Sequence, residues 1–130
     1  MKGVTGVGGV FIKAKDPAAL REWYRVHLGI GEKGQDWAMF HWLEKKDPPV
    51  PAMTVWNVLP ESSDYFDPSP APFMINYRVE DIDAIAAALE AEGIQVKWHT
   101  EADFGRFCWI SDPEGNRIEL WEPPAEDEQK

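Results

Sequence analysis

The chain has 130 residues and a formal net charge of −10 at pH 7. This acidity argues against nucleic acid and anionic membrane surfaces as partners, because both bind basic proteins. A chain of this length is expected to form one domain that buries roughly two-thirds of its unfolded surface. Its single cysteine, Cys108, excludes an internal disulfide and suits the reducing cytoplasm, where we expect the protein to reside.

The first half of the chain predicts a strand, a helix and two further strands. Asp16-Pro17 has the N-cap and first-turn signature of a helix, and Gly29 stands where that helix should stop. The segment 61–72 is rich in proline, serine and aspartate and is predicted to be a linker. The predicted elements are a strand over 4–15, a helix over 18–28 and strands over 37–43 and 53–59.

The second half repeats this pattern. Asp81 caps a second helix as Asp16 caps the first, an offset of about 65 residues, and Glu92-Gly93 closes it. We therefore predict an α+β fold in which one domain, 1–123, contains two βαβββ modules, 4–60 and 73–123, joined by the linker 61–72. Residues 124–130 are expected to form an acidic flexible tail. The predicted elements here are a strand over 73–80, a helix over 82–91 and strands over 94–98, 104–110 and 117–121.

Alternation along the strands separates a helix side from an outer side, and the outer sides of two joined sheets would form a curved trough. In the last strand Ile118 and Leu120 are expected to lie on the helix side, so Glu119 and Trp121 lie on the trough side. A carboxylate in such a position needs a hydrogen-bonding partner, a metal or a ligand. The chain also contains seven tryptophans, and tryptophan-rich small domains use some of these rings to line pockets or interfaces.

Three motifs are similar to those of a known group of proteins. The first is strand-Asp16-Pro17-helix ending in WYRVHLGI, the second is the Glu80-Asp81 helix unit closed by Glu92-Gly93-Ile94, and the third is SDPEGNRIELWEP over 111–123. Together they resemble the vicinal oxygen chelate superfamily, which includes glyoxalase I, bleomycin-resistance proteins and extradiol dioxygenases. The resemblance implies paired βαβββ modules that form a cup for a small ligand, often with a divalent metal, and it implies a homodimer.

The metal positions of the superfamily are only partly filled in this sequence. Glu119 matches the last of the three ligand positions, but the other two fall on Gly9 and Met74. Neither glycine nor a thioether is a ligand for a hard divalent ion. We therefore expect no metal and no other cofactor. The alternative is a non-standard divalent site formed by His41, His99 and Glu119.

The leading functional hypothesis is a metal-independent protein that binds an aromatic or apolar small molecule in the cup near Glu119. The alternative is an enzyme of the lyase or isomerase type, in which Glu119 acts as the general base or a non-standard metal site operates. A further hypothesis is that several tryptophans serve assembly with a partner chain. The expected ligand-binding residues are Phe11, His41, Met74, Asn76, Arg106 and Trp121.

Overall fold

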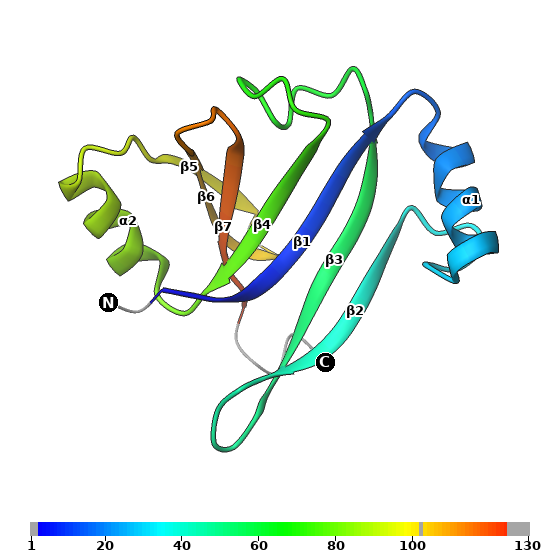
Figure 1. Ribbon diagram of the computed structural model, residues 1–130. Helices are drawn as coiled ribbons and strands as arrows, with labels where there is room; N and C mark the ends of the chain where they lie inside the picture. Colours follow the sequence, from blue (N-terminus) through cyan, green and yellow to red (C-terminus); the bar gives the residue numbers. More distant parts are fainter. Residues whose placement is uncertain (1–2, 102, 125–130) are drawn as a thin grey trace.

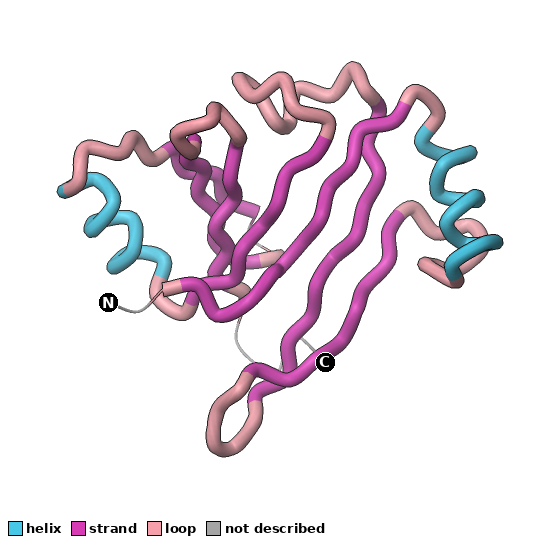
Figure 2. Tube along the Cα trace, in the orientation of Figure 1, coloured by secondary structure: helices cyan, strands magenta, loops and turns pink. Residues whose placement is uncertain are grey.

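The computed structural model describes residues 3–101 and 103–124. Two helices and seven strands follow one another along the chain (Figures 1 and 2). The predicted tail, apart from Pro124, lies outside the described residues. The elements are β1 (Val4–Ala14), α1 (Pro17–Leu28), β2 (Trp37–Glu44), β3 (Val50–Pro60), β4 (Phe73–Val79), α2 (Ile82–Ala91), β5 (Lys97–Glu101), β6 (Gly105–Ser111) and β7 (Arg117–Glu122).

The strands form one mixed, curved sheet in the order β2-β3-β1-β4-β7-β6-β5 (Figure 1). The first strands of the two halves, β1 and β4, pair antiparallel at its centre. Each is followed outward by a parallel neighbour, β3 beside β1 and β7 beside β4. The α+β fold class and the side-by-side joining of two modules are thereby confirmed.

The first module has one strand fewer than the predicted βαβββ pattern. The described segment from Gly29 to Asp36, which corresponds in position to β5, forms bends and turns instead of a strand. Gly29, Gly31 and Gly34 all adopt positive φ there, between 71° and 85°, a conformation that interrupts an extended ladder. As a result β2 is the edge strand of this module, whereas β6 is covered by β5.

The strand predicted over 94–98 was placed too early. The structure begins β5 at Lys97, where it pairs with Trp109 of β6. The Ile94 N–H instead donates to the carbonyl oxygen of Leu89, which closes the C-terminus of α2 beyond the positive-φ residue Gly93. Val96 then packs against the core beneath α2. Ile94 and Val96 therefore hold the end of α2 in place and do not belong to a strand.

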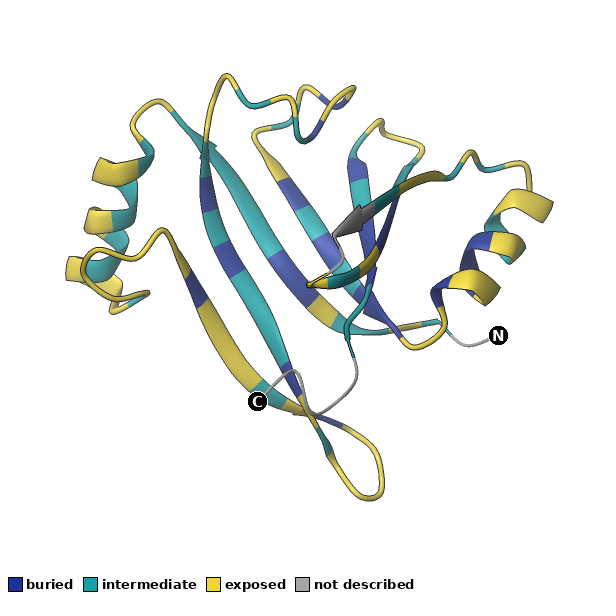
Figure 3. Cartoon of the chain, turned by 180° about the vertical axis from the view of Figure 1, so that it is seen from behind, coloured by how far each residue is buried: buried dark blue, intermediate teal, exposed yellow. Residues whose placement is uncertain are grey.

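Apolar residues of the helices pack against one side of the sheet, as the strand alternation predicted, and Figure 3 shows buried positions recurring along the strands. Asp16 and Asp81 cap α1 and α2, each accepting the backbone N–H three residues on. The helix-side core has two clusters. One contains Val10, Ile12, Ala14, Leu20, Tyr24, Ala38, Trp56 and Val58, and the other contains Tyr77, Val79, Ile82, Ile85, Cys108, Ile118 and Leu120.

Within the described part of the chain, neither helix has the length and apolar character that a membrane crossing requires.

Candidate functional site

Strand register brings four positions into one row on the trough side. Gly9 of β1 lies opposite Asn76 of β4, and Asn76 lies beside Glu119 of β7. Trp109 of β6 is the next residue in the row, opposite Glu119. Side chains in one row of a sheet lie close enough to interact directly, so the register alone places an amide and an indole beside the carboxylate.

Glu119 is 1% exposed and is the centre of a hydrogen-bond cluster. The Asn76 Nδ2 atom donates to Oε1 over 2.8 Å. Oε2 accepts two hydrogen bonds, from the Tyr65 hydroxyl over 2.6 Å and from Trp109 Nε1 over 2.8 Å. All three donors are neutral groups, and together they satisfy much of the requirement that burial imposes on this carboxylate.

The hairpin between β6 and β7 sets this arrangement through Asp112. Its Oδ1 atom accepts the backbone N–H groups of Glu114 and Asn116, and its Oδ2 atom accepts Asn116 Nδ2. These hydrogen bonds, that from the Asn116 side chain first among them, hold the pKa of Asp112 below its usual value. A turn closed in this way fixes the pairing of Ser111 with Arg117, and therefore that of Trp109 with Glu119.

A cavity of about 650 Å³ opens beside Glu119 on the trough side. Its volume lies within the range of pockets that hold drug-sized molecules. Its lining is mainly aromatic and apolar, with a few polar groups. The lining residues are Gly8, Phe11, Trp37, Met39, Met53, Val55, Asn57, Tyr65, Asn76, Asp103, Phe104, Phe107, Glu119, Trp121 and Pro124.

The segment predicted as a linker borders this cavity and is bound tightly to the sheet. Phe66 is fully buried, and the Lys13 ammonium lies 4.9 Å from the centre of its ring. The Arg117 guanidinium donates to the carbonyl oxygen of Asp67. Tyr65 contacts Phe11 with a ring-centroid distance of 6.0 Å and reaches Glu119 with its hydroxyl. The segment therefore contributes a wall to the site.

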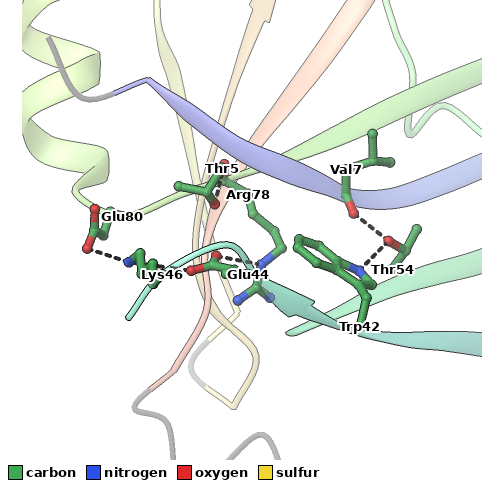
Figure 4. A network of polar contacts seen from close by, with 8 residues as sticks. All are labelled: Thr5, Val7, Trp42, Glu44, Lys46, Thr54, Arg78 and Glu80. Carbon is green, nitrogen blue, oxygen red and sulfur yellow. Dashed lines mark hydrogen bonds and ion pairs between the residues drawn. The ribbon is translucent and has the colours of Figure 1, made fainter. Parts of the chain in front are cut away.

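Further along β4 and β7, the trough is filled by a network around Arg78, which is 3% exposed (Figure 4). Its guanidinium lies over the rings of Trp42 and Trp121, at 5.7 and 5.4 Å from their centres. The Nε atom is 3.5 Å from the Glu44 carboxylate. Burial lowers the pKa of Arg78, and Glu44 opposes that shift. Lys46 bridges Glu44 to Glu80, so this network ties β2 of the first module to β4 of the second.

Two glycines of β1 allow these side chains to approach the strand. A Cβ atom on Gly6 would lie 2.2 Å from the Trp42 ring. A Cβ atom on Gly8 would lie 2.4 Å from Asn76 Oδ1 and 2.8 Å from the Trp121 ring. Contacts below 3.0 Å do not occur at real Cβ atoms, so only glycine fits at both positions without movement of the neighbours.

Four of the predicted site residues lie together, since Phe11, Asn76, Glu119 and Trp121 all line the cavity. The other three do not line it. Met74 is on the trough side opposite Phe11 but is covered and 1% exposed. His41 is exposed on β2, beyond the lining residue Met39.

Arg106 lies away from the cavity because its side chain is on the face of β6 that is turned toward α2. Its guanidinium pairs with Asp83 in two hydrogen bonds of 2.6 and 2.9 Å. This pairing raises the pKa of Arg106 and lowers that of Asp83. The guanidinium also lies over the Trp98 ring at 5.0 Å. Arg106 therefore joins α2 to the sheet.

Sequence reasoning missed two of the three partners that hold Glu119, Tyr65 and Trp109. Tyr65 lies in a segment without regular structure, and the only available signal was a Tyr-Phe pair within a proline- and serine-rich stretch. Trp109 was recognised as a strand residue, but its register opposite Glu119 was not predicted. Trp37, Met39 and Phe104 also line the cavity without having been singled out for it.

The residues present do not fit the divalent ion that the superfamily implies. Beside Glu119, the neighbouring strands supply the amide of Asn76 and the bare backbone of Gly9. Among the described residues, no group of three or more His, Cys, Asp or Glu side chains could hold a metal ion. The alternative site from His41, His99 and Glu119 is therefore not assembled. His99 instead stacks on Trp109, with ring centroids 4.8 Å apart.

Comparison with known proteins gives a consistent family assignment. A model of the glyoxalase-like domain matches residues 9–121. No curated protein matches the sequence. Among solved structures, methylmalonyl-CoA epimerase from Mycobacterium tuberculosis is 25% identical, with 98% of this chain and 93% of that chain covered and a TM-score of 0.60.

Two further solved structures share the fold at lower identity. A Streptomyces coelicolor methylmalonyl-CoA epimerase variant in complex with 2-nitronate-propionyl-CoA is 20% identical, with 95% of this chain and 100% of that chain covered and a TM-score of 0.67. A catechol 2,3-dioxygenase is also 20% identical, with a TM-score of 0.62. The match covers all of this chain and 43% of the dioxygenase.

Proposed function

This chain belongs to the glyoxalase-like family of the vicinal oxygen chelate superfamily, and on that premise we propose that it binds a small, partly aromatic molecule beside Glu119 without a resident metal. The observation that carries the proposal is the cavity of about 650 Å³ with its buried carboxylate. Six aromatic side chains contribute to its lining: Phe11, Trp37, Tyr65, Phe104, Phe107 and Trp121.

The shape and composition of the lining favour a flat, apolar ligand. Aromatic rings offer large contact areas and preferred stacking geometries at little cost in side-chain entropy. Met39 and Met53 lie on neighbouring strands of the same wall, and their unbranched side chains adapt to irregular shapes. Phe107 and Trp121 stack in nearly parallel planes, with an interplanar angle of 1°, which gives that part of the wall a defined orientation.

The hydrogen bonds around Glu119 support binding without a metal. Three neutral donors already contact the carboxylate, so its burial does not require a cation to be bound.

A thermal-shift screen with neutral, cationic and anionic aromatic compounds tests the proposal. We expect at least one class to raise the melting temperature in a concentration-dependent manner. Trp37→Ala should reduce this shift, because Trp37 is a half-exposed ring of the cavity wall. Trp23→Ala is the matched control, since Trp23 is similarly exposed but lies on α1 outside the cavity. A screen without any shift would contradict the proposal.

A second candidate function is proton abstraction by Glu119. It is favoured by the open acceptor position on Oε1, which accepts a single hydrogen bond, and by the position of Glu119 in the cavity wall. Deuterium incorporation at the α-carbon of carbonyl compounds, followed by NMR, is the measurement. Exchange that is lost in Glu119→Gln and retained in Glu114→Gln would establish this function, because Glu114 is exposed in the β6–β7 turn.

Homodimer formation is the remaining part of the proposal. It is supported by the edge strand β2, which exposes Trp37, Phe40 and Leu43 by 44%, 47% and 62%. Such an edge is a ready template for pairing with another chain. Light scattering coupled to size-exclusion chromatography should give twice the mass of 14.8 kDa, and a monomer mass would contradict it.

A further inference from the structure

The polar part of the cavity wall consists mainly of hydrogen-bond acceptors, because Glu119 occupies the donors around it. Tyr65 and Trp109 each have one polar hydrogen, and both hydrogens are directed at Glu119 Oε2. Asn76 directs its amide nitrogen at Oε1, which leaves one amide hydrogen as the only other donor of this cluster. Oε1 itself accepts a single bond and can accept another.

The orientation of the Asn76 amide follows from the same contact. A carboxylate accepts hydrogen bonds, so the NH₂ group of Asn76 must face Glu119 and its Oδ1 atom must face the other way, toward Gly8. Asn76 is 2% exposed, and Oδ1 has no hydrogen-bond partner in the described part of the chain. A buried acceptor without a partner costs free energy, and a hydrogen-bond donor near it would reduce that cost.

The charged side chains that line the cavity have one sign, and the nearby Arg78 guanidinium lies over the Trp121 ring and pairs with Glu44. Glu119 and Asp103 are its ionisable acids, and the described lining residues include no lysine, arginine or histidine. The described residues place no cationic side chain within ion-pair distance of Glu119. Arg117 interacts with Glu119 only at longer range, because its guanidinium lies over the Trp109 ring at 5.0 Å and donates to the carbonyl oxygen of Asp67.

We infer that the ligand carries a protonated nitrogen, as an ammonium or amidinium group, on a flat aromatic body. The nitrogen donates to Glu119 Oε1, and the ring lies against the aromatic walls. Attraction between a cation and the faces of aromatic rings adds to this preference. The inference rests on the proposed function, since it assumes that this cavity binds an aromatic molecule, and it names the class of that molecule.

Three probes with one ring system test the inference by isothermal titration calorimetry on the unmodified protein at neutral pH. They are naphthylmethylamine, naphthylmethanol and naphthoate, which are cationic, neutral and anionic. We expect the amine to bind about ten-fold or more tightly than the alcohol, because a hydrogen bond between charged groups exceeds its neutral counterpart by this order. The naphthoate should bind most weakly of the three.

The outcomes separate the inference from the proposed function. If the alcohol or the naphthoate binds as tightly as the amine, the inference is overturned and the proposed function stands. If none of the three binds at millimolar concentration, both are contradicted. This comparison uses the wild-type chain and so does not depend on whether a variant folds.

A variant tests whether Glu119 is the residue that favours the charged amine over the neutral alcohol. Glu119→Gln should bring the ratio of alcohol to amine dissociation constants close to one. Glu114→Gln removes the same charge from the exposed β6–β7 turn and should leave the ratio unchanged. An unchanged ratio in a folded Glu119→Gln variant would contradict the assignment of the nitrogen to Glu119.

Discussion

The Asn76 Nδ2 atom lies 2.8 Å from Glu119 Oε1, with both side chains almost fully buried on adjacent parallel strands. In the superfamily, the position of Glu119 is one at which a metal is bound. In this chain, Glu119 Oε1 instead accepts a hydrogen bond from the Asn76 side-chain amide. The same contact directs Asn76 Oδ1 toward Gly8, so a single hydrogen bond determines the polarity of the cavity wall.

Removal of the Tyr65 hydroxyl should destabilise the protein. Tyr65→Phe leaves Glu119 Oε2 with one donor in place of two, so we expect a loss of about 1–3 kcal/mol in the free energy of unfolding. Urea denaturation followed by circular dichroism measures it. Tyr77→Phe is the control, because Tyr77 packs in the helix-side core and none of the described residues accepts a hydrogen bond from its hydroxyl, so its effect should be much smaller. Equal effects would argue against a structural role for the Tyr65–Glu119 bond.

A methyl group on Gly8 should disturb both stability and binding. Gly8→Ala places a Cβ atom within 3.0 Å of Asn76 Oδ1, Trp121 and Arg78, and overpacking of this kind costs about 1–3 kcal/mol. We expect a lower melting temperature and weaker ligand binding, because Asn76 and Trp121 must move. Gly3→Ala should leave both unchanged, since a Cβ atom at Gly3 would meet nothing within 4 Å.

The two acidic partners of Lys46, Glu44 and Glu80, should differ greatly in their contribution to the free energy of unfolding. Glu44→Ala removes the buried carboxylate that faces Arg78, and loss of one partner of a buried ion pair costs about 3–5 kcal/mol. Glu80→Ala removes an exposed carboxylate that pairs with Lys46 at the surface, for which we expect a much smaller loss. Thermal and urea denaturation of both variants provide the comparison, and similar losses would show that the Arg78 network does not join the modules.

The buried thiol should produce a distinct pH dependence of stability. Burial raises the pKa of Cys108 from 9.0 to about 11, with Glu119 adding to the effect. Between these values the unfolded chain releases the thiol proton and the folded chain retains it, so stability falls as the pH rises from about 9 to about 11.

Cys108→Ala isolates this contribution. The wild type should lose about 2 kcal/mol more than the variant over that pH range. The native thiol should also resist alkylation at pH 8, since Cys108 is fully buried. Parallel pH profiles of the two proteins would contradict the prediction.

Metal analysis of the purified protein tests the prediction that Glu119 does not bind a divalent ion. Protein purified without chelator should contain far less than one equivalent of any divalent transition metal. Its melting temperature should be unchanged by EDTA or by added Mn²⁺, Co²⁺, Ni²⁺ or Zn²⁺, because a neutral amide and a glycine flank Glu119. A stoichiometric metal that EDTA removes with a fall in melting temperature would contradict this prediction.

The fold was largely accessible from local signals. Asp16 and Asp81 cap the two helices as predicted, and the alternation in β7 correctly assigned Glu119 and Trp121 to the trough. The errors lie where a local signal was ambiguous. Ile94 was assigned to a strand that follows Glu92-Gly93 directly, but it closes α2. The βαβββ pattern implied a further strand in the first module, but no strand was predicted between residues 28 and 37, and the structure has turns with three positive-φ glycines there.

By itself, the sequence determined the α+β modules, the trough side of β1, β4 and β7, and the position of the acidic residue at the centre of the trough. Those features depend on periodicity and turn chemistry, which act over a few residues. Only the tertiary structure decided that Tyr65, Asn76 and Trp109 would meet at Glu119. These residues are up to 54 positions apart from it in the chain, and their meeting depends on strand register and on how segment 61–72 folds back over the sheet. Such long-range contacts leave no periodic signal in a single sequence.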